Sequence, residues 1–322
     1  MSFDFNKVFK LAFFDWFKQK GILKYFIFLF VFYALVNLAT VYTMHSVFSP
    51  LADASTIAPA EAITLMVFFF TYLFALIFIS WIVASLFSYF LITKALNAIK
   101  KDFVEFNTKQ WLRFLVLSIA ECFAAMLSIF NLKLLLILVA AIILIIASAL
   151  LFVLSYFSNY LFILLGVLLL VLALLLFVAY FFIWIYNSIR LTFSTIIFVE
   201  KKRGIMESLK ASWGLTKGNV VNIFIVILAI GLAAGVISWI VTLPLTFYQA
   251  GTGAVLEQNS AEAFNQLINP VVMIMLIPSI IVQSIFIIIQ IFGLVAIYAE
   301  LTKTGKFAKA VAKKKPAKAK RK

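Results

Sequence analysis

The sequence predicts an all-α, polytopic helical membrane protein with six transmembrane helices and additional interfacial helices. The chain of 322 residues is 66% hydrophobic and 12% charged, with a mean hydropathy of +1.16, whereas a soluble domain is about half apolar and about a quarter charged. A folded core cannot hide that much hydrocarbon, so lipid must serve as the solvent. The second observation is charge spacing. All 27 Lys and Arg residues fall into four clusters separated by long apolar runs, at residues 7–24, 94–133, 190–217 and 303–322.

The clusters also predict the topology. Short loops rich in Lys and Arg stay on the cytoplasmic side, and the stretches 45–62, 155–159 and 244–269 carry no Lys or Arg. Four basic faces that alternate with three base-free faces require six crossings. We therefore expect a multi-pass protein of the cell membrane with both termini cytoplasmic, and the Lys/Ala/Pro composition of residues 303–322 separately suggests a prokaryotic origin. The single cysteine, Cys122, excludes an internal disulfide and a thiolate metal cage.

The first third of the chain predicts one interfacial helix and two crossings. Residues 1–21 alternate Phe and Lys near helical spacing, which indicates an amphipathic cytoplasmic helix. Residues 22–44 form the first crossing, 45–62 a polar outer loop, and 63–92 the second crossing. Alternating charges over residues 93–113 predict a cytoplasmic helix.

Residues 114–130 are ambiguous. Ser118, Glu121, Ala125 and Ser128 share one helix face, and a crossing here would bury Glu121 and place Lys133 outside. An interfacial helix keeps every Lys and Arg inside, so we favour it. The alternative is eight crossings, with residues 160–199 split in two, but that run has no Gly or Pro near its middle to turn it.

The remaining crossings are expected at residues 134–154, 160–185, 219–243 and 270–300. The fourth helix should continue to about residue 199 along the inner interface. Pro244 is expected to end the fifth helix, while Pro270 opens the sixth and Pro278 kinks it. Residues 303–322 form a Lys/Ala-rich tail, expected to be disordered.

The most distinctive segment begins at Arg190, which ends an apolar helix, and Glu200 follows ten residues later. The next residues predict a short interfacial helix within 200–217. Its Ile205, Leu209 and Trp213 share one face, so it should lie against the membrane. Gly218 is the expected C-terminal stop.

This segment resembles the membrane domain of the glycerophosphoryl diester phosphodiesterase family and related prokaryotic membrane families of unknown function. Their pattern is an Arg that ends a helix, an acidic residue about ten later, and Ala-Leu-x-x-Ser-x-x-Leu-x-x-Gly before a transmembrane helix. The positions that carry it here are Arg190, Glu200, Glu207, Ser208, Leu209, Ser212, Leu215, Lys217 and Gly218, and the run from Ala296 to Glu300 is similar to the family's closing Tyr-Tyr-acidic element. Thr195-Ile-Ile-Phe stands where the family has a Pro. The resemblance covers about residues 186–243 and 290–303.

The resemblance implies a membrane module without enzymatic activity. In family members that are phosphodiesterases, catalysis belongs to a separate soluble barrel, and only residues 303–322 follow the last predicted crossing here. The residues agree, because the single histidine, His45, lies in a loop and the chain has no nucleophile motif, P-loop or Cys/His metal set. We expect no cofactor.

The sequence allows two interpretations of the role of each of several polar residues. Arg190 and Glu200 either form an ion pair that braces or gates the cytoplasmic end, or they reach separately into the interface. Glu121 is either a proton or ion site within the membrane or a solvated interfacial carboxylate. Gln283 and Gln290, seven residues apart, either line a polar path or hydrogen-bond between helices.

The expected partners follow from the same features. Gly231 and Gly235 form a G-x-x-x-G that serves either packing within the chain or a homodimer. The tail fits anionic lipid headgroups better than nucleic acid or the ribosome, because it has no aromatic residue for stacking after Phe307. The expected role is membrane or envelope homeostasis, or the handling of membrane proteins. The alternatives are a small transporter or channel and a scaffold that docks RNA or ribosomes.

Overall fold

The computed structural model describes residues 4–19, 21–52, 59–100, 106–130, 132–155, 160–256 and 270–303, and these residues form helices and the turns and short connections between them. Six of these helices are long and apolar enough to cross a membrane, which confirms the predicted fold class. Their candidate spans are Ile22–Ser46, Ile63–Ile99, Leu134–Leu154, Tyr160–Lys201, Val220–Phe247 and Ile274–Thr302. Most large apolar side chains of these helices are not covered by other parts of the chain, as expected for helices that face lipid. The chain is a multi-pass membrane protein in contact with the bilayer.

The chain divides into two compact units, which are described separately. The first consists of Met1–Trp111 and Ile225–Lys322, and the second of Leu112–Phe224. The boundaries fall inside helix α4 (Thr108–Met126) and inside helix α9 (Val220–Leu256).

The first unit begins with helical residues that pack on its last helix. The segment passes through three helix types, α1 (Phe5–Lys10), the π-helical η1 (Leu11–Asp15) and the 3₁₀-helical η2 (Trp16–Lys18). Val8, Ala12 and Trp16 are buried at a spacing of four residues, and α1, η1 and η2 contact α11 (Pro270–Lys303). Residues 5–18 therefore pack one face on α11. A helix that lay free in the interface would have no such contact with another helix.

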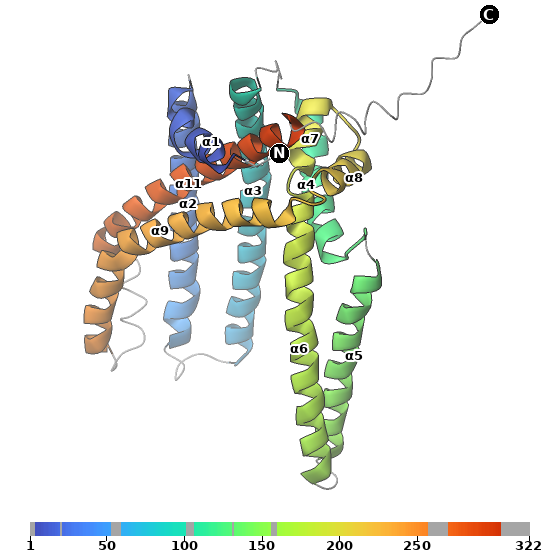
Figure 1. The fold of residues 1–322 in the computed structure, drawn as a ribbon. Helices are drawn as coiled ribbons and strands as arrows, with labels where there is room; N and C mark the ends of the chain where they lie inside the picture. The colour runs from blue at the N-terminus through green and yellow to red at the C-terminus, as the bar shows by residue number, and fades with distance from the viewer. Residues whose placement is uncertain are drawn as a thin grey trace, which may run out of the picture. The chain divides into compact units, whose positions relative to one another are not determined.

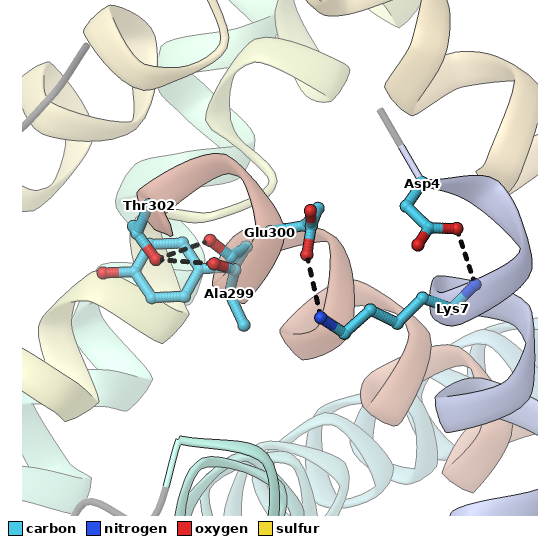
Figure 2. A network of polar contacts seen from close by, with 6 residues as sticks. Asp4, Lys7, Ala299, Glu300 and Thr302 are labelled. Atoms are coloured by element: carbon cyan, nitrogen blue, oxygen red, sulfur yellow. Dashed lines mark hydrogen bonds and ion pairs between the residues drawn. The ribbon is translucent and has the colours of Figure 1, made fainter. Parts of the chain in front are cut away.

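An ion pair joins the same two elements (Figure 2). The Asp4 carboxylate caps α1 by accepting a hydrogen bond from the Lys7 backbone N–H at 3.1 Å. The Lys7 ammonium then lies 3.8 Å from the Glu300 carboxylate of α11. The predicted N-terminal helix is thus attached to the C-terminal helix by both apolar and charged contacts.

Helices α2 (Ile22–Ala52) and α3 (Pro59–Ile99) pack on each other and on α11. Aromatic pairs join α2 to α3, with Phe28 and Phe87 at 4.6 Å between ring centroids and Tyr25 and Phe90 at 5.8 Å. The outer loop expected at residues 45–62 is shorter than predicted, because α2 continues to Ala52 and α3 begins at Pro59.

Two other boundaries in this unit differ from expectation. Residues 93–113 are not one helix, since α3 ends at Ile99 and Phe106 and Asn107 are non-helical. Asn107 caps α4 instead, and its side-chain oxygen accepts from the Lys109 backbone N–H at 2.9 Å. Pro244 does not end α9, which continues through it to Leu256, because one proline removes one backbone hydrogen bond and a long helix can absorb that loss.

The second unit contains a long helical hairpin. Helices α5 (Leu132–Ser155) and α6 (Tyr160–Leu191) run side by side (Figure 1). The Ser148 hydroxyl donates to the Gly166 carbonyl at 2.8 Å, and Gly166 leaves room for the Phe152 ring. Helix α6 is continuous, so residues 160–191 are not split as the eight-crossing alternative requires.

The fourth helix was predicted to continue to about residue 199, but in the structure it is interrupted before that residue. It ends at Leu191, Thr192 and Phe193 form a turn, and α7 (Ser194–Lys201) follows. Lys202 closes α7 in the left-handed conformation with φ 50°, and α8 (Ile205–Leu215) comes next. The α6–α7 break positions the candidate site.

Candidate functional site

The break between α6 and α7 is held by hydroxyl groups from α8. The Ser212 hydroxyl donates to the Arg190 carbonyl at 2.9 Å and accepts from the Phe193 backbone N–H at 3.2 Å. The Thr216 hydroxyl shares its one proton between the Arg190 carbonyl at 3.2 Å and the Ser212 carbonyl, one turn earlier in the chain, at 3.0 Å. Both hydroxyl side chains are fully buried. They replace backbone hydrogen bonds that the helix loses where it breaks.

The Arg190 side chain joins α6 to α8 a second time. Its guanidinium lies 3.8 Å from the centroid of the Trp213 ring and donates to the Trp213 carbonyl. It also donates to the Tyr186 hydroxyl at 3.3 Å. The Trp213 ring stacks on Phe130, with 5.0 Å between centroids. A cation–π contact of a desolvated arginine contributes about 2 kcal/mol. We refer to the residues that join α6 to α8 as the α6–α8 brace: Arg190, Phe193, Ser212, Trp213 and Thr216.

The brace replaces the ion pair considered between Arg190 and Glu200. In the described part of the chain, Arg190 contacts Tyr186 and Trp213 rather than Glu200. Simple snorkelling does not describe Arg190 either, because the side chain is only 9% exposed. Glu200 lies near the end of α7 and has a different contact.

Of the three α8 residues predicted to lie against the membrane, Leu209 is buried within the protein, whereas Ile205 and Trp213 are partly exposed. The buried residues of α8 are Ser208, Leu209, Ser212 and Leu215, and Trp213 covers Arg190. The face that packs within the unit is therefore centred on serines, which the hydrophobic periodicity could not identify. Lys217 is exposed, and Gly218 follows the helix with φ 83°, a left-handed conformation that glycine adopts easily.

The polar face of α4 packs on α6 and α7. The Asn187 amide of α6 donates to the Ala125 carbonyl at 3.2 Å and to the Ser128 hydroxyl at 2.8 Å. One α4 turn before Ala125, the Glu121 carboxylate accepts a hydrogen bond from the Ser194 hydroxyl at the start of α7. Glu121, Ala125 and Ser128 thus make the interhelical contacts of this face, whereas Ser118 bonds to Phe114 in its own helix.

The electrostatics of Glu121 are unusual. Helix α4 is not among the six candidate spans, and Glu121 is mostly buried. Burial raises the pKa of the Glu121 carboxyl to about 7, although the hydrogen bond from Ser194 acts in the opposite direction. The group therefore changes charge near neutral pH.

The remaining candidates lie in the first unit. Gln283 and Gln290 are exposed on α11, and both line a crevice beside α9 together with Gly235. A Cβ atom at Gly231 or Gly235 would meet nothing within 4 Å. Close packing of these glycines within the chain, one of the two interpretations given from the sequence, is therefore not observed among the described residues, and the other, a homodimer, stays a prediction.

Two further predictions, on metal ions and on the basic tail, concern residues outside these sites. No group of three or more His, Cys, Asp or Glu residues that could hold a metal ion occurs where the chain is described. The tail from residue 304 onward lies outside the described residues. Sequence reasoning missed Ser194 and Thr216 as contact residues, and it considered Asn187 only for the polar lining of a transport path. Asn187 and Ser194 are small polar residues close to apolar runs, which was the available signal, whereas Thr216 stands beside Lys217 and Gly218 and offered no such signal.

Comparison with known proteins finds a family match over the C-terminal part of the chain, which holds the brace. Residues 168–322 match the model of the family described as the membrane domain of glycerophosphoryl diester phosphodiesterase. The match confirms the resemblance predicted from the sequence and extends it to a larger part of the chain. No curated protein and no solved structure matches the chain.

Proposed function

We propose, from the membrane-domain match over residues 168–322, that this protein is a non-enzymatic membrane module for membrane or envelope homeostasis or for handling membrane proteins. The observation that carries the proposal is how the polar residues of the matched segment are used. Arg190, Ser212 and Thr216 bond to the break in α6 and to α8. Groups engaged in this way position helices and are not available to a substrate.

The brace presents charged residues that fit a lipid surface. It fixes α7 and α8 at one end of the membrane-crossing α6 (Figure 1). Lys202, Lys210 and Lys217 are exposed on and beside these short helices. Basic side chains at that depth attract anionic headgroups, at about 1 kcal/mol for each charge near the surface. The proposed orientation places this end, and both termini, on the cytoplasmic side.

The transporter alternative has less support. It requires a continuous polar lining from Glu121, Asn187, Arg190, Gln283 and Gln290. Asn187 and Arg190 already donate hydrogen bonds within the protein, which does not favour a role in lining a path. We therefore retain the membrane module as the function supported best.

Complementation of a deletion strain tests this proposal. We expect deletion to increase the entry of a membrane-impermeant dye and to induce an envelope-stress reporter. The wild-type gene and the control Ser188→Ala should restore both, and the brace variant Arg190→Ala should not. The control is matched because Ser188 bonds only locally, to the Trp184 carbonyl of its own helix.

Three outcomes would overturn the proposal. A deletion strain with unchanged dye entry and stress signal would remove the homeostasis role. Solute flux through proteoliposomes of the purified protein would indicate a transporter. Hydrolysis of a phosphodiester by the purified protein would indicate an enzyme. Co-sedimentation with ribosomes that is lost on deleting residues 303–322 would instead support the scaffold alternative.

A further inference from the structure

The last candidate span, Ile274–Thr302, exposes polar side chains where lipid would favour apolar ones. Half of the most apolar stretch of this span is buried within the chain. From Ser279 to Thr302 the structure describes every residue, and only Gln283 and Gln290 are exposed. Gln283 lies nine residues after the start of the span and Gln290 twelve before its end, which places both amides at the depth of the hydrocarbon. A helix that only faced lipid would do the opposite and cover its amides.

The two amides lack partners within the protein. Neither one is hydrogen-bonded to another residue in the part of the chain that the structure describes. The hydrocarbon region supplies no water, so an unpaired amide is strongly disfavoured there. A lipid acyl chain has no donor or acceptor, so lipid beside these residues would not correct the deficit. The partner must therefore be a protein surface with polar groups at the same depth.

The glutamines lie in a crevice between α11 and α9, within the first unit. The crevice has two adjoining parts, which share Ala234, Phe286 and Gln290. Its α9 wall consists largely of small residues: Gly231, Ala234, Gly235 and Ser238. A Cβ atom at either glycine would meet nothing within 4 Å, so this wall is open to a neighbour. Small residues of this kind let a second helix approach closely in a membrane.

The spacing of the two amides favours a second copy of this chain as that neighbour. Gln283 and Gln290 are seven residues apart, about 10 Å along the helix, and a repeat of seven keeps both on one seam where two helices cross at a shallow angle. Two copies related by a two-fold axis along the membrane normal hold identical residues at identical depth. Each glutamine then meets its own copy, and an amide pairs with an amide because it carries both donors and acceptors.

We propose that two copies of this protein pair in parallel through this crevice, with Gln283 and Gln290 hydrogen-bonded to the same residues of the second copy. Phe286 and Ile287 lie between the two glutamines and line the same crevice. The small residues of α9 leave room for the side chains of the second α11. The pairing does not depend on the membrane role proposed above, because it uses one face of α11 and not the α6–α8 brace.

Energy transfer between labelled copies in liposomes tests the pairing. The full-length protein carries one exposed cysteine, Cys122, for the donor or acceptor dye. We expect energy transfer to increase with the protein-to-lipid ratio. The double variant Gln283→Leu and Gln290→Leu should associate about tenfold more weakly or less, because two interhelical amide pairs are lost. Leucine suits a lipid-facing position, so this variant should still fold.

Three further variants separate amide pairing from other causes of association. Gln283→Asn combined with Gln290→Asn keeps both amides and should retain most of the association. The matched control Thr71→Val removes an exposed polar group of α3 whose hydroxyl bonds only to the Val67 carbonyl of its own helix, and it should behave as the wild type. Equal association of the leucine variant and the wild type, or no energy transfer at any ratio, would overturn the proposal. Association that is lost in Gly235→Ile but kept in the leucine variant would place the interface on α9 alone and would also overturn it.

Disulfide cross-linking provides a second measurement that leaves both glutamines in place. In a Cys122→Ser background, Ile287→Cys should form linked dimers in liposomes under mild oxidation, because identical residues face each other in a parallel pair. Ile240→Cys, on α9 and 53% exposed but outside the crevice lining, should stay monomeric. A monomeric Ile287→Cys protein, or equal cross-linking of the two variants, would refute the pairing.

Discussion

Replacing Ser212 by alanine removes the hydroxyl at the centre of the α6–α8 brace. The side chain is fully buried and makes two hydrogen bonds across the break, to the Arg190 carbonyl at 2.9 Å and from the Phe193 N–H at 3.2 Å. A buried hydrogen bond contributes about 1 kcal/mol. The Arg190 carbonyl keeps its bond from Thr216, so we expect a loss of about 2 kcal/mol and not a collapse of the fold.

Thermal unfolding of the purified protein in detergent measures this loss. For a chain of this size, about 2 kcal/mol corresponds to a decrease of roughly 5 °C in the midpoint. Ser188→Ala is the matched control on α6, and it should change the midpoint by less than about 1 °C because its hydroxyl returns to its own helix. Equal midpoints for Ser212→Ala and Ser188→Ala would refute the reasoning that tertiary hydroxyls hold the break.

Three further predictions concern other parts of the chain. Glu121→Gln should become more stable than the wild type as pH rises from 5 to 8. Burial raises the pKa of Glu121 from its ordinary value of 4.5 to about 7 in the folded state, so the wild type loses folding free energy as pH rises through this range, whereas the Gln variant does not. The difference is at most about 3 kcal/mol. Melting curves at each pH measure it, and a constant difference would contradict it. Gly293→Leu should destabilise α11 by about 1–3 kcal/mol, because even a Cβ there lies 2.8 Å from the Ile230 side chain; an unchanged midpoint would show that this contact is not tight. Lys7→Ala should cost less than about 1 kcal/mol, since the side chain is 48% exposed beside Glu300, and a midpoint shift of several degrees would show that the ion pair matters more than its exposure suggests.

The sequence predicted the helices that depend on composition and missed the features that depend on tertiary contacts. Six apolar runs are sufficient to identify six spans, because their length and hydropathy are local properties. The end of α6 at Leu191 was not predicted, since the groups that satisfy the break, Ser212 and Thr216, are more than twenty residues away in the chain. No apolar periodicity reports such a contact.

The candidate site shows the same division. Arg190 was identified because a charged residue that ends a long apolar helix is conspicuous. Its partner Trp213 was not identified, because Trp213 was predicted to face the membrane and because Glu200, which carries the opposite charge, was considered as the partner. The structure pairs the guanidinium with a ring and a backbone carbonyl instead, which an arginine accommodates well because it is planar and weakly hydrated.

The placement of Lys133 tests the six-crossing topology most directly. In a Cys122→Ser background, Lys133→Cys at the start of α5 should be unreactive toward an impermeant maleimide in intact cells and should react after permeabilisation. Ser158→Cys, expected on the opposite face, is the control that should react in both conditions. Reaction of Lys133→Cys in intact cells would mean that α4 crosses the membrane, and it would contradict the six-crossing account.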